Sequence, residues 1–316
     1  MLLPAAIRSV IETRAHAVPQ KELQAAAAAL SAHYRSGGGS EIINSDAATA
    51  AYLAARMPAT YAAVHAALIA VRTALPDFAP RSMVDAGAGP GTASLAATEV
   101  FASLTGFTLL DSNARLLDTA RIFSAAHPPL ASAEFQRADL AAAEIPEADL
   151  VIAAYALTEL KAGERAALLE KLRAAARGVL LIVEPGTPAA FEILRQDRGR
   201  LIARGAFIAA PCPHENPCPM QAPDWCHFAA RVQRSRAHRA LKGDAPFEDE
   251  KYSYAAFCRA PPGARLPRVL ASPRISKAGA TLKLCGAGGI REARIAARDK
   301  ENFRAAKRAA WGGVFR

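Results

Sequence analysis

The chain has 316 residues, 52% of them hydrophobic, and a formal net charge of +10. This length allows two domains and a well-buried core, and no run of about eighteen apolar residues predicts a membrane span. The first residues lack a basic stretch followed by a long apolar one, so no signal peptide is expected. We therefore expect a cytoplasmic protein without a membrane partner.

The positive charge is concentrated at one end of the chain. Residues 259–316 carry 14 Lys and Arg against 3 Asp and Glu, whereas the remainder is close to neutral. A basic segment attached to a neutral body is typical of a nucleic-acid-binding protein. The alternative is a solvated or disordered basic surface with no such partner.

Residues 1–78 are predicted to form an N-terminal helical region. A helix is expected from Pro19 to Tyr34, where the Gly37-Gly38-Gly39-Ser40 segment then breaks it. Apolar residues recur at helical spacing between Tyr52 and Val71, and Pro58 predicts two helices there instead of one.

Residues 79–210 alternate short apolar strands with helices. The expected strands are 82–85, 107–111, 150–154 and 179–184, with a helix at 163–176. This alternation predicts an α/β doubly wound parallel sheet. Beyond residue 210 proline and glycine become frequent, so 211–316 is predicted to be a cysteine-rich, basic region with a terminal helix near 299–311.

A glycine-rich turn follows the first strand, with Gly87, Gly89 and Gly91 at alternate positions. Glycine lets the backbone turn sharply and approach a ligand closely. A dinucleotide fold places its third glycine one position later, where this chain has Thr92. Asp85, before the turn, suits a cationic ligand, and Asp111, ending the next strand, is expected to accept hydrogen bonds from ribose hydroxyls.

The segment from Val84 to Thr92 resembles motif one of class I S-adenosylmethionine-dependent methyltransferases. The resemblance implies a Rossmann-like fold and an S-adenosylmethionine site, with Asp139 and Leu140 flanking the adenine. It also implies that Ala154 and Tyr155 line the floor of the site after the fourth strand. A nucleotide-fold domain that has lost its ligand is the alternative.

No catalytic residue can be assigned. The chain after the fourth strand has no Asn/Asp-Pro-Pro-aromatic motif, and no cysteine nucleophile occurs before residue 212. Glu159 and Glu184 are candidate bases, or else an ordinary helix residue and an ordinary residue at the edge of the sheet.

All five cysteines lie in the last third of the chain. Cys212, Cys218 and Cys226 fall within fifteen residues among prolines, and their spacings miss both zinc knuckles and common ferredoxin patterns. They predict a metal or an iron–sulfur cluster, with His214 and His227 as alternative ligands and inert buried thiols as the opposing hypothesis. An odd, bunched set of cysteines is typical of reduced thiols in a cytosolic compartment and not of a secreted disulfide framework.

These cysteine motifs are also similar to a known family. Cys212-Pro213-His214, Cys218-Pro219 and Trp225-Cys226-His227-Phe228, with later matches at His238-Arg239, residues 248–254, Leu284-Cys285 and Trp311-Gly312, resemble the mitochondrial small-ribosomal-subunit methyltransferase-like family. Its bacterial relatives are called predicted ribosomal RNA methylases. The match begins before the sheet, at residues 56–61, and so spans most of the chain.

The resemblance implies a class I fold with a [4Fe–4S] cluster, and zinc is the competing occupant. The implied ligands are Cys212, Cys218, Cys226 and a late cysteine, for which Cys285 is preferred over Cys258. The implied partner is small-subunit rRNA during ribosome assembly, and no DNA partner is expected.

Three functions are consistent with these observations. The first is an assembly factor that binds S-adenosylmethionine and whose cluster positions basic residues against rRNA phosphates, namely Arg265, Arg268, Arg274, Lys277 and Lys283. The second is an active rRNA methyltransferase, and the third a small-molecule methyltransferase with a zinc-stiffened lid. The nucleotide modified, the occupant of the cysteine site and the oligomeric state are left open by the sequence.

Overall fold

A computed structural model describes residues 1–316 of the chain. Its N-terminal region is helical, as predicted, and consists of α1 (Ala5–His16), α2 (Gln20–Arg35), η1 (Ser40–Ile42), α3 (Asp46–Ala55) and α4 (Met57–Ala74). The chain bends by 43° between α3 and α4. Pro58 lies in the first turn of α4, where a missing backbone N–H costs nothing, so the two expected helices are confirmed. No single helix has the length and apolar character needed to cross a membrane, and only the bent pair α3 and α4 meets those criteria together.

The main sheet begins after these helices and alternates with further helices. Its first part comprises β1 (Ser82–Ala86), α5 (Thr92–Val100), β2 (Gly106–Asp111), α6 (Ala114–Ala126), η2 (Pro128–Leu130), β3 (Glu134–Arg137), β4 (Ala148–Ala154), η3 (Leu157–Glu159), α7 (Ala162–Ala175) and β5 (Ala176–Pro185). Its second part comprises α8 (Pro188–Ala203), β6 (Phe207–Ala210), β7 (Phe228–Gln233), α9 (Arg236–Lys242) and β8 (Phe247–Cys258). The four strands expected from the sequence are all present, whereas β3, which is short and exposed, was not anticipated.

The strand order is β3-β2-β1-β4-β5-β8-β6, and β7 pairs with β8 off this path. Strands β1 to β5 pair in parallel, and β8 runs antiparallel between β5 and β6. This is the class I methyltransferase arrangement, so the predicted Rossmann-like α/β sheet is confirmed. The strand order reverses between β1 and β4, which makes this the topological switch point of the sheet. Open α/β sheets bind ligands at the carboxyl ends of the strands beside such a point.

The packing differs from the expected division of the chain in two respects. One core cluster of 52 buried residues joins the N-terminal helices to one face of the sheet and to β7 and β8, so residues 1–78 share a core with the sheet. The sheet also continues past residue 210, because β8 occupies a place between β5 and β6. A second cluster of 19 residues lies on the opposite face under α7 and α8.

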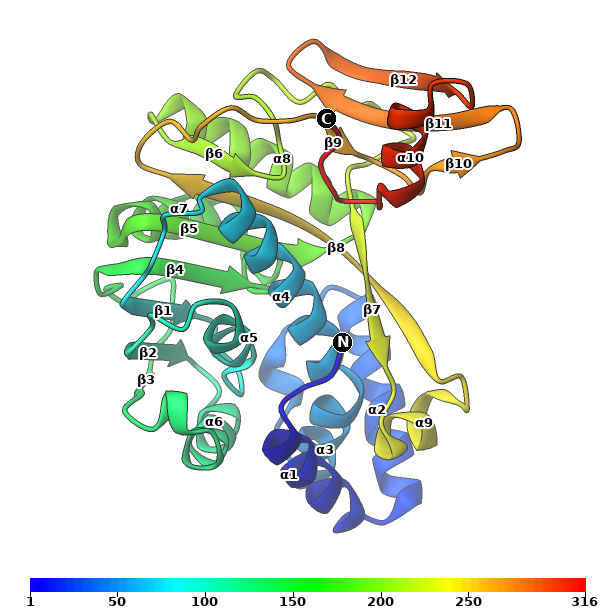
Figure 1. The fold of residues 1–316 in the computed structure, drawn as a ribbon. Coiled ribbons are helices and arrows are strands. Elements are labelled where there is room, and N and C mark those ends of the chain that lie inside the picture. Colours follow the sequence, from blue (N-terminus) through cyan, green and yellow to red (C-terminus); the bar gives the residue numbers. More distant parts are fainter.

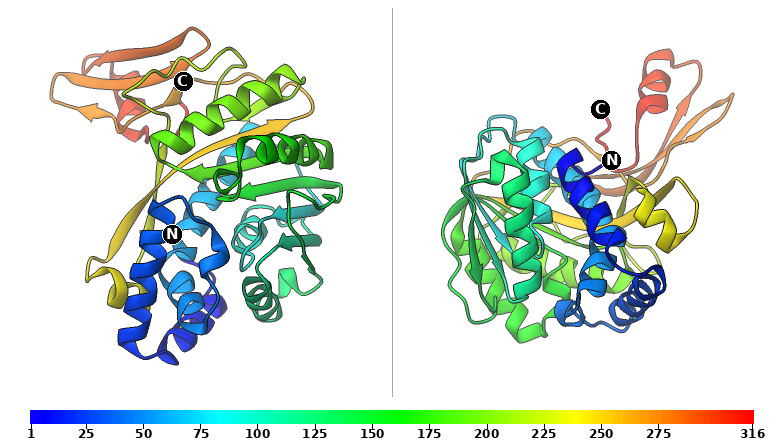
Figure 2. Two further views of the ribbon diagram at one scale, coloured as in Figure 1. Left: turned by 180° about the vertical axis from the view of Figure 1, so that it is seen from behind. Right: turned by 90° about the horizontal axis from the view of Figure 1, so that it is seen from below.

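The C-terminal end forms a small unit of its own, the C-terminal unit. It contains β9 (Arg268–Val269), β10 (Arg274–Ile275), β11 (Gly279–Gly286), β12 (Gly289–Ala296) and α10 (Lys300–Arg308). Its four strands form a separate sheet, and α10 covers one face through a core cluster of five buried residues. Figure 1 shows this unit in orange and red beside α8, and Figure 2 shows it projecting from the main body. The terminal helix predicted near 299–311 is therefore present.

Candidate functional site

The glycine turn lies at the carboxyl end of β1, between that strand and α5. Gly87, Gly89 and Gly91 all have positive φ, at 78°, 54° and 79°, a region that side chains with a Cβ avoid. A Cβ at Gly87 would also lie only 2.8 Å from the Ala156 Cβ. Glycine is therefore needed at Gly87 for both its backbone conformation and the close approach of the segment after β4.

Asp111 ties the turn to the end of β2. Its Oδ2 accepts a hydrogen bond from the Gly89 N–H at 2.7 Å, and its Oδ1 accepts one from the Asn113 N–H at 2.7 Å. Each carboxylate oxygen has a second lone pair, so Asp111 retains the capacity to accept from a ligand hydroxyl. Burial raises the pKa of this carboxyl, and the two N–H groups oppose that effect.

Asp85 is buried at 1% exposure and bonds within the protein. Its Oδ2 accepts from both the backbone N–H of Ser94, at 3.0 Å, and the Ser94 hydroxyl, at 2.8 Å. Burial raises the pKa of Asp85 to about 6. The expected contact with a ligand amino group thus competes with a contact that fastens the strand to α5.

The other predicted cofactor residues surround the same turn. Leu140 lies beside it, since its Cδ1 would be 3.5 Å from a Cβ at Gly87. Asp139 is exposed and accepts from the Ala141 N–H at 3.0 Å. Tyr155 has a φ of 58°, the only positive value outside glycine, and its hydroxyl donates to Glu250 Oε1 at 2.9 Å.

Sequence reasoning missed the cover over this edge of the sheet. The Asn113 amide donates to the carbonyls of Ser40, at 2.9 Å, and Ile43, at 3.2 Å, so the segment after the glycine-rich break closes over the end of β2. The Tyr52 hydroxyl would lie 3.9 Å from a Cβ at Gly89. The clue in the sequence was the short polar segment between two helices, which had only been interpreted as a helix break.

Glu184, one of the two candidate bases, holds the chain that follows β4. Glu184, at the end of β5, accepts from the Leu157 N–H at 3.0 Å and from the Thr158 hydroxyl at 2.7 Å. Both of its oxygens therefore hold the chain that continues from β4. Burial raises the pKa of Glu184 to about 7, and burial together with the Glu184 charge raises that of Glu159 to about 7.

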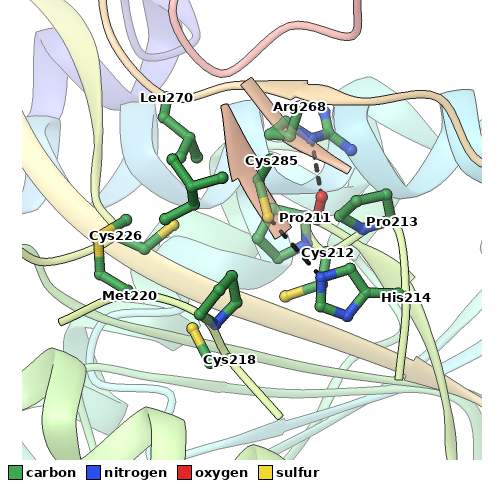
Figure 3. Close-up of a pocket in the computed structure, with 12 residues that line it drawn as sticks. Pro211, Cys212, Pro213, His214, Cys218, Met220, Cys226, Arg268, Leu270 and Cys285 are labelled. Carbon is green, nitrogen blue, oxygen red and sulfur yellow. Dashed lines mark hydrogen bonds between the residues drawn. The ribbon is translucent and has the colours of Figure 1, made fainter. Parts of the chain in front are cut away.

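The cysteine pocket is a second, separate site. Cys212, Cys218, Cys226 and Cys285 line one hollow, together with His214, Arg268 and six apolar or proline residues (Figure 3). The first three come from the loop between β6 and β7, and Cys285 comes from β11 of the C-terminal unit. The Cys285 Sγ lies 3.8 Å from the His214 Nε2.

Cys258 lies outside this pocket. It ends β8 and its thiol contacts the carbonyls of Phe207, at 3.7 Å, and Ala260, at 3.1 Å. The four thiols of the pocket influence one another, because burial and then the charges of Cys212, Cys218 and Cys285 raise the pKa of Cys226 well above its ordinary value. No set of three or more His, Cys, Asp or Glu side chains in the chain has the arrangement needed to hold a single metal ion.

An aromatic stack fastens the cysteine loop to its surroundings. The rings of Trp225 and His227 stack at 4.6 Å between centroids, and Trp311 meets His227 edge-on at 4.9 Å. The Trp225 indole N–H donates to the carbonyl of Gly186, just after β5, at 2.9 Å. The loop that carries the cysteines is thereby joined both to the main sheet and to the C-terminal tail.

The basic residues expected to face phosphates are mostly engaged elsewhere. Arg265 forms a bidentate pair with Glu215 at 2.6 and 2.7 Å, and Lys283 pairs with Asp224 at 2.6 Å. Arg268 is buried against backbone carbonyls, and Arg274 pairs with Glu292 at 2.7 Å. Of these five residues, only Lys277 is both exposed and free of an ion pair. The expectation that the other four face phosphates is wrong, because their cations already have partners within the protein.

The chain is similar to known proteins over most of its length. The family described as "Mitochondrial small ribosomal subunit Rsm22" matches residues 46–316. The human ribosome assembly protein METTL17, mitochondrial, is 28% identical over 292 residues, which cover 83% of this chain and 61% of the human protein. The Rsm22-cox11 tandem protein 2, mitochondrial, of Schizosaccharomyces pombe is 27% identical over 193 residues, or 54% of this chain and 25% of that protein. The chain thus spans only part of the length of these curated relatives.

Solved structures of methyltransferases are also similar, at low identity. Magnesium protoporphyrin IX methyltransferase from Synechocystis PCC 6803 with bound SAM has a TM-score of 0.43 and 15% identity, covering 64% of this chain and 80% of that one. Human N-acetylserotonin methyltransferase in complex with SAM has a TM-score of 0.36 and 15% identity, covering 61% and 51%.

One sequence-based prediction is overturned by these relatives. The cytoplasmic location is wrong by this comparison, because the curated relatives are mitochondrial proteins. The resemblance seen in the cysteine motifs is confirmed, since the family match extends from residue 46 to the end of the chain. The chain belongs to the Rsm22 family.

Proposed function

We propose that this chain assists the assembly of a small ribosomal subunit by binding its rRNA through the C-terminal unit. One observation carries the proposal: four cysteines from two distant segments line a single pocket at the junction of the main body and a basic unit. A thiolate-bound centre at that junction would hold the basic unit in one orientation. The similarity to a human ribosome assembly protein supports the same function.

The cysteine pocket suits a [4Fe–4S] cluster in its donor chemistry. Four thiols are the ligand set of such clusters and also of tetrathiolate zinc sites. A cluster holds its thiolates farther apart than a single ion does, because several iron and sulfide atoms lie between them. The long sequence spacings between Cys212, Cys218 and Cys226 fit zinc knuckles poorly, which favours the cluster over zinc. Cys212, Cys218, Cys226 and Cys285 would be its ligands.

The glycine turn suits S-adenosylmethionine, which supplies a methyl group when bound. Gly87, Gly89 and Gly91 would let the backbone approach the cofactor, and Asp111 would accept from its ribose. Leu140, beside the turn, would pack against the adenine, with Asp139 at the solvent edge. Asp85 would support the turn through Ser94.

The surface that would contact rRNA lies on α10. Exposed cations without an ion pair lie along this helix: Lys300, Arg304, Lys307 and Arg308. The spacing of Lys300, Arg304, Lys307 and Arg308 puts them on one face of α10, while Ala306 packs inward. Phosphate binding by such a face releases counterions and weakens steeply with salt.

The test begins with anaerobic purification of the full chain, followed by iron, sulfide and zinc analysis. We expect a brown protein with about four iron and four sulfide per chain, the composition of the cluster. Its binding to deproteinised small-subunit rRNA is then measured at several salt concentrations. A colourless zinc protein without RNA affinity would contradict the proposal and favour the small-molecule methyltransferase.

Methyl transfer to rRNA is a second candidate function, and Tyr155 favours it. A non-glycine residue with positive φ stores strain, which is often found at active sites, and here the strained residue directly follows β4 beside the glycine turn. Its half-buried hydroxyl donates to Glu250. Transfer of label from S-adenosylmethionine to the rRNA, lost in Gly89→Arg and reduced in Tyr155→Phe, would establish the methyltransferase. Binding of rRNA without transfer of label would favour the assembly factor over the methyltransferase.

A further inference from the structure

Arg268 brings a positive charge to the wall of the cysteine pocket. It is only 8% exposed and begins β9 of the C-terminal unit. Its Nε donates to the Pro211 carbonyl at 2.8 Å (Figure 3). Its Nη1 donates to the Gly312 carbonyl at 2.9 Å. These bonds hold the guanidinium beside Cys212, next to Pro211 in the chain, and across the strand pair from Cys285.

Arg198 brings a second charge to the same thiols from the main body. It lies on α8, is 5% exposed, and donates through Nη2 to the carbonyl of His214 at 2.6 Å. Its Nε is buried without a partner. Its guanidinium therefore lies within reach of the Cys212 thiol, two residues before His214.

Neither arginine has a carboxylate partner. Asp197, the neighbour of Arg198 in the chain, pairs with Arg165 and Arg200 instead. Removing a cation from water without a counter-charge is costly, so two buried arginines at one site indicate an anion there. The only groups in the pocket that can become anionic are the four thiols.

We propose that Arg198 and Arg268 are the counter-charges of an anionic, thiolate-bound iron–sulfur centre in this pocket and raise its reduction potential. The inference rests on the cluster assigned under the proposed function. One-electron reduction makes or breaks no bond and adds one negative charge to a centre that its thiolates already make anionic. Nearby buried cations stabilise the reduced form more than the oxidised form, because charges interact strongly where water is excluded.

The experiment compares the full chain with Arg198→Met and Arg268→Met, purified anaerobically with the cluster intact. The reduction potential is measured by titration with dithionite, the electron donor, and followed by electron paramagnetic resonance. Each Met variant is expected to shift the reduced-to-oxidised ratio about tenfold toward the oxidised form, or ~59 mV to more negative potential for one electron.

Charge-conserving variants separate electrostatics from packing. Arg198→Lys and Arg268→Lys keep the charge and are expected to stay close to the wild-type potential. Arg259→Met is the matched control, since Arg259 also donates to backbone carbonyls, those of Arg173, Ala174 and Ala176, but outside the pocket. It is expected to leave the potential unchanged.

The outcomes distinguish failure of the arginine role from failure of the cluster. Unchanged potentials in both Met variants, or Lys variants that shift as far as the Met variants, would overturn the role of the arginines while the cluster stands. If the Met variants lose iron but the Lys variants retain it, the role of the arginines as counter-charges is supported. If the Met and the Lys variants both lose iron, that role is overturned. A wild-type protein without iron and sulfide overturns the cluster and this inference together.

Discussion

The two candidate sites are built at very different ranges along the chain. The glycine turn, Asp85, Ser94 and Asp111 lie within 27 residues of one another, and their contacts arise directly from one strand–turn–helix–strand unit. The cysteine pocket joins Cys212 to Cys285, across β7 and β8 of the main sheet and β9 and β10 of the C-terminal unit. The first site is thus formed by local backbone geometry, and the second depends on the docking of two separately packed parts.

This difference predicts that the sites can be damaged independently. A change in the pocket should loosen the C-terminal unit, whose own core has only five buried residues, and leave the larger core of the sheet intact. A change in the turn should do the opposite, so variants of the two sites should have separate effects on the cluster and on the cofactor.

The largest effect is expected from Cys285→Ser. Loss of the only proposed ligand from the C-terminal unit should abolish iron and sulfide binding and weaken rRNA affinity at least tenfold, while S-adenosylmethionine affinity, measured by calorimetry, stays unchanged. Cys258→Ser is the control, because its thiol lies outside the pocket, and it should retain full iron content. Cluster loss in the control and not in Cys285→Ser would reverse the ligand assignment.

Gly87→Val is the reciprocal change. A Cβ there meets Ala156 at 2.8 Å and requires positive φ, so we expect S-adenosylmethionine affinity to fall about a hundredfold with normal iron content. Gly205→Ala, which has a φ of 85° and open space around it, tests the backbone cost alone. It should lower stability by about 1–2 kcal/mol without changing cofactor affinity. Equal losses of affinity in both variants would disprove the steric explanation.

Glu184 should make stability depend on pH at the cofactor edge. Its folded-state pKa of about 7 lies above the unfolded value of 4.5, so its stabilisation is complete below pH 4.5 and is lost as pH rises through 7. Urea unfolding between pH 4.5 and 8 should show wild type losing about 3 kcal/mol relative to Glu184→Gln over this window. Parallel pH profiles of the two proteins would show that folding does not raise the pKa of Glu184.

The smallest effect concerns the basic face of α10. Replacing Arg304, Lys307 and Arg308 together by Gln should weaken rRNA binding about tenfold at moderate salt. It should also make the plot of log affinity against log salt shallower by about 2, since each single-strand phosphate contact contributes about 0.7.

A control with the same charge change lies at the other end of the molecule. Lys21, Arg35 and Arg236 are exposed on the N-terminal helices and α9, far from the C-terminal unit in Figure 1. Their replacement by Gln should leave the salt dependence almost unchanged. Equal losses in both triple variants would indicate that only net charge matters.

The sequence alone determined the features that depend on near neighbours. Strands β1, β2, β4 and β5, the break at Pro58 and the glycine turn were predictable because each is set by periodicity or backbone sterics within a few residues. The bunching of Cys212, Cys218 and Cys226 likewise indicated a site without any structure.

Only the tertiary structure decided which distant groups meet. The position of β8 within the sheet brings Glu250 to Tyr155, and the pairing of β9 with β11 sets Arg268 opposite Cys285. The same packing removed Arg265 and Lys283 from the free basic surface by giving them Glu215 and Asp224 as partners. Such contacts depend on strand register and on how separate elements dock, and neither is encoded in the spacing of residues along the chain.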